Sequence, residues 1–228
     1  MQLVIKKKFK KMKKGFIFDL DGVIVDTAKY HYLAWQKLAN QLGFEFSEEQ
    51  NELFKGVSRK RCLEILIKIG NITATKDQFD TWMIEKNIDY LEYIKNMDAS
   101  EILPDVSKVL EFLKGRSIPI ALGSASKNAR LILEKVNLLH YFDIIVDGNN
   151  VTKAKPDPEV FLLAAKQLGV KATDCIVFED AVAGIEAANA AKMVSIGIGN
   201  EKTLREAQFN FTDFTEMSKD FIEGLIKE

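Results

Sequence analysis

The sequence has few cysteines and prolines and no long apolar run. Its 228 residues include two cysteines, Cys62 and Cys175, and four prolines. Two cysteines are too few for a disulfide framework and are typical of the reducing cytoplasm. No apolar stretch approaches the roughly 18 residues of a membrane span, and lysines stand where a secretory signal would be apolar. We therefore expect a cytoplasmic protein that does not enter a membrane.

Acidic residues are absent from the first 14 positions, which hold seven lysines. Removing these charges from the overall net charge of −1 leaves −8 for residues 15–228. A general nucleic-acid binder needs a basic face on its folded body, so we expect no nucleic-acid partner. We interpret residues 1–11 as a dispensable basic arm.

Five short apolar runs are separated by helical patterns. Continuous apolar runs of this length are typical of strands that are buried on both faces of a parallel sheet. One connecting helix is predicted to have Asp157 as its N-cap, Pro158 as its first residue and Gly169 at its end. This alternation predicts a doubly wound α/β domain with right-handed crossovers. The runs cover residues 15–19, 118–122, 142–146, 175–178 and 193–198.

A stretch of about 70 residues after the first run interrupts this alternation. It contains helical patterns and no convincing strand. We interpret residues 27–98 as an inserted all-helical cap, and residues 1–26 and 99–228 as the core domain, with hinges at Thr27 and near residue 98. The helices are predicted over residues 29–42, 48–54, 59–69 and 76–97.

Polar residues follow the apolar runs at the positions where a parallel sheet binds its ligands. Acidic side chains at two strand ends can hold one Mg²⁺ ion, which prefers oxygen ligands. A divalent ion would shield Asp19 from a phosphate dianion, so that this carboxylate could act as a nucleophile. Asp21 is placed to act as the general acid and base. The other polar residues at strand ends are Ser124, Lys155, Glu179 and Asp180.

These motifs, in this order, resemble the haloacid dehalogenase superfamily of aspartate-nucleophile phosphotransferases. The resemblance rests on Asp19-Leu-Asp-Gly with Asp26-Thr27, then Ser124, then Lys155-Pro156, then Glu179-Asp180. It implies a Rossmann-like core, a phosphoaspartate at Asp19, and phosphoryl contacts from Ser124 and Lys155. It also implies Mg²⁺ held by Asp19, Asp21, Glu179 and Asp180. Superfamily members that hydrolyse ATP in transport carry Thr at position 21, whereas phosphatases and mutases carry Asp.

Within the superfamily, the cap is similar to that of mutases that interconvert β-glucose 1-phosphate and glucose 6-phosphate through β-glucose 1,6-bisphosphate. The resemblance implies that His31 helps to position Asp21 and that Trp35 lines the sugar pocket. The alternative interpretations are a partly buried interface pair for His31 and Trp35, and solvated lysines for Lys86 and Lys55. The substrate contacts implied are Trp35, Lys55, Gly56, Val57, Ser58, Arg59, Lys86, Ala125, Ser126, Lys127 and Asn128.

A mutase that forms a bisphosphate needs a second phosphate site. Ser126, Lys127 and Asn128 stand at the expected start of a helix, where free N–H groups attract anions, and Arg59 could bind the same phosphate from the cap. Cys62 departs from the resemblance, because mutases typically have a hydroxyl residue there and a thiol is a weaker hydrogen-bonding group. The alternative interpretation of Cys62 is a helix-core residue.

Three other functions remain for comparison. A capped sugar-phosphate phosphatase would share every core motif, so only the cap and residues 124–128 favour the mutase. A signalling receiver domain would be about half as long and would lack the cap. A dinucleotide-binding enzyme would need Gly-x-Gly-x-x-Gly after the first strand. We expect a monomer that binds small sugar phosphates.

Overall fold

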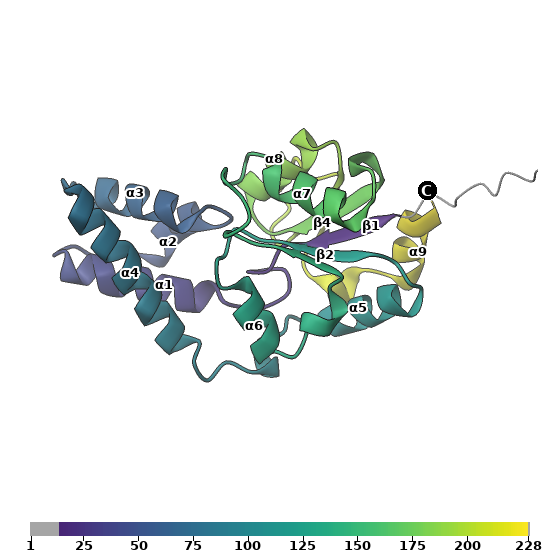
Figure 1. The fold of residues 1–228 in the computed structure, drawn as a ribbon, viewed down its shortest axis with the longest axis horizontal. Coiled ribbons are helices and arrows are strands. Elements are labelled where there is room, and N and C mark those ends of the chain that lie inside the picture. Colours follow the sequence, from purple (N-terminus) through teal and green to yellow (C-terminus); the bar gives the residue numbers. More distant parts are fainter. Residues whose placement is uncertain (1–13, 228) are drawn as a thin grey trace, which may run out of the picture.

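The computed structural model describes residues 14–227, and a six-stranded parallel sheet organises the core (Figure 1). The strand order is β3-β2-β1-β4-β5-β6. The chain therefore adds β2 and β3 on one side of β1 and then adds β4, β5 and β6 on the other side. This reversal lies between β1 and β4, the place where a doubly wound sheet binds its ligands. The strands are β1 (Gly15–Phe18), β2 (Ile120–Gly123), β3 (Ile144–Val146), β4 (Cys175–Glu179), β5 (Val194–Ile198) and β6 (Phe209–Phe211).

Both faces of the sheet are buried, as the continuous apolar runs indicate. In β1, Phe16 and Phe18 enter one hydrophobic cluster and Ile17 enters the other. Figure 1 shows α7 and α8 on one face and α5, α6 and α9 on the other. The doubly wound α/β prediction is therefore confirmed. These helices are α5 (Val106–Gly115), α6 (Ala129–Lys135), α7 (Glu159–Leu168), α8 (Val182–Ala190) and α9 (Lys219–Lys227).

The helices between β1 and β2 pack against one another around a hydrophobic cluster of their own. Trp35, Phe54 and Leu63 are among the residues buried in that cluster. Figure 1 shows these helices beside the sheet and at the carboxyl ends of its strands. We call this group the cap helices; they are α1 (Ala28–Gln41), α2 (Glu48–Asn51), α3 (Arg59–Ile69) and α4 (Lys76–Tyr93). Single 3₁₀ turns are η1 (Glu52–Phe54), η2 (Ala99–Glu101), η3 (Leu139–Tyr141), η4 (Ala172–Asp174) and η5 (Phe214–Glu216).

Several predicted boundaries differ from the structure. Helix α4 ends at Tyr93, because Ile94 and Met97 leave the helix and are buried in the core cluster instead. The predicted helix over residues 48–54 is a short α2 followed by a 3₁₀ turn. Helix α7 begins at Glu159, one residue after Pro158, although the Asp157 carboxylate accepts a hydrogen bond from the Glu159 N–H at 3.0 Å.

The two connections between cap and core run side by side. The Asp26 N–H donates to the Glu101 carbonyl at 2.9 Å, and the Leu103 N–H donates to the Ile24 carbonyl at 3.0 Å. The Glu101 carboxylate also accepts hydrogen bonds from Lys29 at 2.7 Å and Tyr30 at 2.6 Å. Helix α1 is therefore tied to both connections at its first turn.

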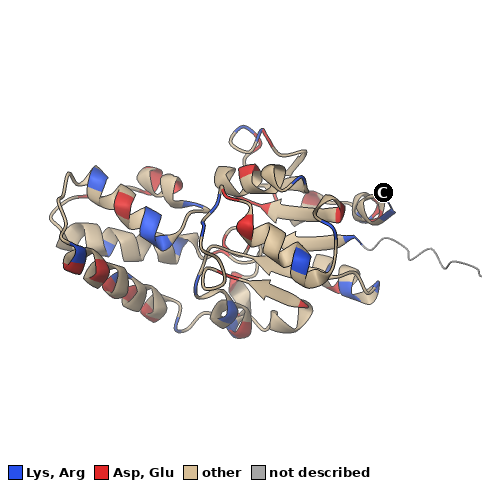
Figure 2. Cartoon of the chain, turned by 45° about the horizontal axis from the view of Figure 1, so that its top comes forward, with Lys and Arg blue, Asp and Glu red and all other residues tan. Residues whose placement is uncertain are grey.

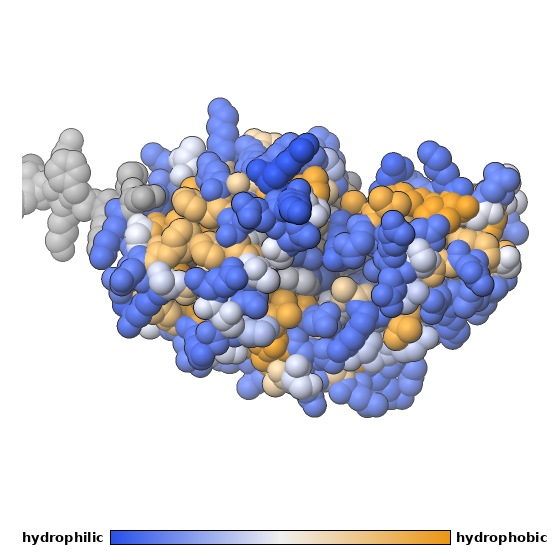
Figure 3. Space-filling model, turned by 180° about the vertical axis from the view of Figure 1, so that it is seen from behind, coloured by the Kyte–Doolittle hydropathy of each residue, from blue (hydrophilic) through white to orange (hydrophobic). Residues whose placement is uncertain are grey.

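The surface of the described chain carries mixed charge and polarity. In Figure 2, Lys and Arg are interspersed with Asp and Glu on both the cap helices and the core. Figure 3 shows hydrophobic side chains in separate patches on a mostly hydrophilic face. Among residues 14–227, no helix is both long and apolar enough to cross a membrane. The basic arm predicted at residues 1–11 lies outside the described residues.

Candidate active site

The loop after β1 places two aspartates at the carboxyl edge of the sheet. The Asp19 N–H donates to the Phe178 carbonyl at 3.0 Å, which ties this residue to the neighbouring strand β4. The loop then turns at Gly22, whose φ of 77° is in the left-handed region, and the Gly22 N–H donates to the Val25 carbonyl at 2.9 Å. Such a φ suits glycine because it lacks a Cβ atom.

Three of the predicted acidic residues lie together. Carboxylate oxygens of Asp19, Glu179 and Asp180 all lie within 4.8 Å of one another. Lys155 lies between two of them, with Nζ 2.8 Å from Asp19 and in contact with Glu179. Burial favours a lower pKa for Lys155, but the two carboxylates outweigh it and raise this pKa. Lys155 is therefore held as a cation beside Asp19.

The acidic cluster suits a divalent cation. Burial raises the pKa of Glu179 to about 7 although Lys155 opposes the shift, and burial together with Glu179 raises the pKa of Asp180. Crowded buried carboxylates are costly unless positive charge neutralises them, and carboxylate oxygens are preferred Mg²⁺ ligands. The carboxylate of Asp21 is not part of this cluster. The geometry therefore gives no support to the prediction that the Asp21 side chain binds the metal ion.

Asp21 instead accepts a hydrogen bond from the hydroxyl of Thr27, the residue before helix α1. Burial, and then the charge of Asp19, raises the pKa of Asp21 to about 6, although the Thr27 hydrogen bond opposes the shift. A carboxyl group with a pKa near the working pH can both donate and accept a proton. The predicted acid–base residue therefore has suitable surroundings for that role.

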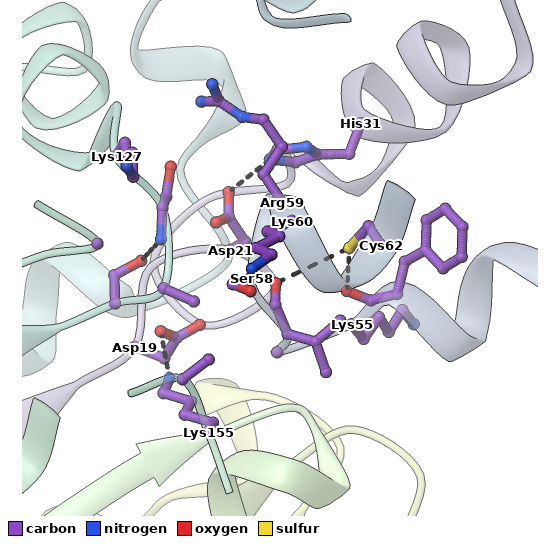
Figure 4. A pocket seen from close by; sticks show the side chains of 18 of the residues that line it. Asp19, Asp21, His31, Lys55, Ser58, Arg59, Lys60, Cys62, Lys127 and Lys155 are labelled. Carbon is purple, nitrogen blue, oxygen red and sulfur yellow. Dashed lines mark hydrogen bonds and ion pairs between the residues drawn. The ribbon is translucent and has the colours of Figure 1, made fainter. Parts of the chain in front are cut away.

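His31 and Lys86 connect the cap to Asp21. Lys86 Nζ lies 2.9 Å from His31 Nδ1, and His31 Nε2 lies 3.9 Å from the Asp21 carboxylate (Figure 4). Burial and then the charge of Lys86 lower the pKa of His31 well below its usual value. A neutral His31 that accepts from Lys86 at Nδ1 carries its proton at Nε2, on the side of Asp21.

Lys86 is buried, so its interpretation as a solvated helix lysine is wrong. Its exposed fraction is 1%, and its Nζ lies 4.6 Å from the centre of the Trp35 ring and 4.8 Å from that of Tyr90. Burial lowers the pKa of Lys86 to about 7. None of the described carboxylates lies within ion-pair distance of this ammonium group.

Arg59 and Cys62 lie on the first turn of α3. Ser58 caps this helix, since its hydroxyl accepts a hydrogen bond from the Arg61 N–H at 3.3 Å. Arg59 forms no ion pair with any described carboxylate, and burial lowers its pKa. The Cys62 thiol contacts the Phe54 and Val57 carbonyls at 3.7 and 3.9 Å, and burial raises its pKa to about 12. Cys62 therefore belongs to the cap core and also borders the site.

Core and cap residues line one cavity of about 370 Å³, a size suited to a small ligand. Figure 4 shows Asp19 and Lys155 on its core side and His31, Arg59 and Cys62 on its cap side. Of the predicted site residues, Thr27, Asn128 and Glu179 do not line it. Those that do are Asp19, Asp21, His31, Trp35, Lys55, Gly56, Val57, Ser58, Arg59, Lys86, Ser124, Ala125, Ser126, Lys127, Lys155 and Asp180.

Comparison with known proteins agrees with this geometry. Residues 13–192 match the family model described as haloacid dehalogenase-like hydrolase. The chain belongs to this family. It is 37% identical to beta-phosphoglucomutase of Bacillus subtilis (strain 168), over 92% of this chain and 93% of the relative.

Two further proteins similar to this chain are named for different activities. A crystal structure of beta-phosphoglucomutase from Clostridium difficile superposes with a TM-score of 0.90 at 39% identity, covering 94% of this chain and 97% of that chain. The fructose-1-phosphate phosphatase YqaB of Escherichia coli (strain K12) is 33% identical, over 81% of this chain and 95% of the relative. The family therefore includes relatives named as a mutase and as a phosphatase.

Several residues that line the cavity were not predicted from the sequence. Gly148, in the segment after β3, lies so close to the Ala125 carbonyl that a Cβ atom would overlap it, and this close approach requires glycine. Asn51 and Met83 reach the cavity from cap helices, where nothing in the local pattern distinguishes them from core residues. The unpredicted lining residues are Ala28, Asn51, Phe54, Lys60, Met83, Gly148, Val151, Thr152, Lys153, Ala154 and Val160, together with Cys62, for which two interpretations were open.

A glycine behind the acidic cluster provides a test of the metal site. A Cβ atom at Gly184 would overlap the buried Glu179 carboxylate. If Glu179 is a ligand, Gly184→Ala is expected to displace its carboxylate and weaken Mg²⁺ binding about 10- to 100-fold. Isothermal titration calorimetry with Mg²⁺ measures the change. Gly224→Ala is the matched control, because nothing lies within 4 Å of a Cβ atom there. Equal Mg²⁺ affinity in the two variants would contradict the assignment of Glu179 as a ligand.

Proposed function

We propose that this protein is a Mg²⁺-dependent β-phosphoglucomutase that interconverts β-glucose 1-phosphate and glucose 6-phosphate. The observation that carries the proposal is the pair of cationic regions in one cavity. Lys155 lies beside Asp19 at one end, and Arg59 and Lys127 line the same cavity from cap and core. A phosphatase acting on one phosphate group needs only the first region, whereas a bisphosphate needs both.

The chemistry follows from the roles of Asp19 and Asp21. The phosphorylated carboxylate of Asp19 passes its phosphoryl group to the free hydroxyl of a bound glucose phosphate, while Asp21 accepts the hydroxyl proton. The bisphosphate then reorients within the cavity, so that its other phosphoryl group faces Asp19. Asp19 attacks its other phosphoryl group, and Asp21 returns the proton to the leaving oxygen. Atoms and charge balance over the two transfers, so Asp19 is phosphorylated again at the end.

The remaining core residues hold the phosphoryl group during transfer. Lys155 supplies a fixed positive charge, and Ser124 supplies a hydroxyl at the end of β2. Asp19, Glu179 and Asp180 would hold the Mg²⁺ ion, which screens the charges of nucleophile and phosphate. Residues 27–98 are proposed to move as one cap about the hinges at Thr27 and residue 98. Closure excludes water, which keeps a transferase from acting as a hydrolase.

The second phosphate is proposed to bind between Arg59 and the loop over residues 124–128. Arg59 offers a planar, bidentate donor without a carboxylate partner among the described residues. Helix α6 has only seven residues, so the side chains of Lys127 and Arg59 would supply most of the positive charge. Trp35, Val57 and Lys86 would then face the sugar between the two phosphates.

A paired assay tests the proposal. β-Glucose 1-phosphate is supplied with Mg²⁺ and a trace of β-glucose 1,6-bisphosphate, and both glucose 6-phosphate and free phosphate are followed. We expect rapid formation of glucose 6-phosphate with little free phosphate. Release of phosphate without isomerisation would instead support a sugar-phosphate phosphatase, the alternative favoured by the likeness to the fructose-1-phosphate phosphatase.

Removal of Arg59 is expected to affect the two reactions differently. Arg59→Ala should lower kcat/KM of the mutase reaction about 10²-fold, as loss of a charged bidentate contact does, and hydrolysis of 4-nitrophenyl phosphate much less. Arg61→Ala is the matched control, since Arg61 is exposed and pairs with Glu64 at 3.0 Å outside the cavity. Equal losses in both reactions would argue against a second phosphate site at Arg59.

Three further properties complete the proposal. The acidic cluster and the family support Mg²⁺ as the resident ion, which chelation followed by titration with Mg²⁺ or Ca²⁺ would test. The two unpaired cysteines support a cytoplasmic location. We propose a monomer that binds sugar phosphates and no nucleic acid, which light scattering and a nucleic-acid binding titration would test.

A further inference from the structure

Helix α6 of the core touches the last two turns of α4 and the segment after it. Near the start of α6, the Asn128 side-chain amide donates to the Asn87 amide oxygen at 3.0 Å. At the end of α6, Lys135 Nζ donates to the Lys95 carbonyl at 2.6 Å. Figure 1 shows α6 on the side of the core that faces the cap helices. The contact at Lys95 lies close to the second connection between cap and core, whereas the contact at Asn87 joins the cap to the core eleven residues before residue 98.

The contact between Asn87 and Asn128 joins the neighbours in sequence of two residues that line the cavity. Each asparagine follows a lysine that lines the cavity, Lys86 on the cap and Lys127 on the core. Both asparagines are half-buried, and neither lines the cavity. The amide of Asn128, which was expected to bind substrate, is thus engaged with the cap.

Asn128 is firmly attached to the core. Its N–H donates to the Ser126 hydroxyl at 3.2 Å, and the Ser126 N–H donates to the Ser124 hydroxyl at 3.0 Å. On its other side the loop is held by Asn149, whose side-chain amide donates to the Lys127 carbonyl at 3.0 Å. These hydrogen bonds tie the loop to the core rather than to the cap. Any movement of the cap away from the core would therefore break the hydrogen bond between Asn128 and Asn87.

We propose that Asn87 is a positioning residue that, through Asn128, latches the cap over the second phosphate site. This inference rests on the proposed mutase function. The latch joins α4, which carries Lys86, to the loop that carries Lys127, so it forms only when both walls of the cavity are in place. Its loss lets the cap open more often during a turnover. Water then reaches the phosphoenzyme, and phosphate is released in place of glucose 6-phosphate.

A double-mutant cycle tests the latch. Asn87→Ala, Asn128→Ala and the double variant are compared in the paired assay for glucose 6-phosphate and free phosphate. We expect Asn87→Ala to raise the ratio of free phosphate to glucose 6-phosphate about five- to tenfold, the effect of one lost hydrogen bond. Asn87→Ala should change this ratio no further in a chain that already carries Asn128→Ala, because the two residues act through one contact.

Asp89→Ala is the matched control, since Asp89 lies on the same helix and pairs with Lys37 within the cap at 2.6 Å. It should leave the ratio unchanged while perturbing the cap to a similar extent. An unchanged ratio in Asn87→Ala, an equal rise in Asp89→Ala, or independent effects of the two asparagines would each overturn the latch. Failure of the wild-type protein to form glucose 6-phosphate would overturn the proposed function instead.

Discussion

Replacing Asp19 by Asn is expected to abolish both isomerisation and phosphate release, with a loss of at least about 10⁴-fold. The amide introduced at this position would be neutral and a poor nucleophile, so no phosphorylated enzyme could form. Asparagine is nearly isosteric with aspartate, and Lys155 would keep its other partner, Glu179. Glucose 6-phosphate, free phosphate and the phosphorylated protein, the last by intact mass spectrometry, are measured in parallel.

The loss must be specific to the nucleophile. Asp77→Asn makes the same chemical change at an exposed position on the first turn of α4 and should retain full activity. Thermal unfolding of Asp19→Asn should occur at or above the wild-type temperature, because the substitution removes one charge from a crowded acidic cluster. Clear residual turnover in a preparation free of other phosphatases would refute Asp19 as the nucleophile.

Local sequence patterns were sufficient to predict that polar residues from separate strands meet at one edge of the sheet. Residues 15–19 form an apolar run that ends in an acidic residue, and parallel strands bring their carboxyl ends to one edge. Asp19, Ser124, Lys155 and Asp180 therefore converge although more than 100 residues separate the first from the second. Strand β6 was missed, because Phe209–Phe211 is a three-residue edge strand with too little periodicity to distinguish it from a loop.

What the sequence could not predict depends on how the cap lies against the core. Lys86 has charged and polar neighbours in sequence, and only the packing of α4 against α1 brings Trp35 over its ammonium group. The contact between Asn87 and Asn128 likewise joins residues 41 positions apart on separate units. Helical periodicity gives the faces of each helix but not the partner that covers them.

The burial of Lys86 leads to a second strong prediction, a gain of stability at the expense of activity. Lys86→Met should raise the free energy of unfolding at pH 7 by about 1–2 kcal/mol, since the gain from removing a buried charge exceeds the cost of leaving His31 Nδ1 without its donor. This corresponds to roughly 3–6 °C in Tm for a chain of this size. Mutase kcat/KM should fall about 10²-fold, because His31 loses its charged partner and the sugar would lose the contact proposed for Lys86.

The dependence of this gain on pH identifies its cause. The pKa of Lys86 falls from an ordinary 10.5 to about 7 in the folded protein, so between these values the unfolded chain binds one more proton than the folded chain. The stability of the wild-type protein then rises with pH across that window, whereas Lys86→Met lacks this contribution. Calorimetry at pH 7 and pH 10 should therefore show a smaller stability advantage of Lys86→Met at the higher pH.

Lys76→Met, at an exposed position on the same helix, is the control and should show neither the gain in stability nor its pH dependence. An advantage that is constant with pH would mean that improved packing, rather than removal of a buried charge, stabilises the variant.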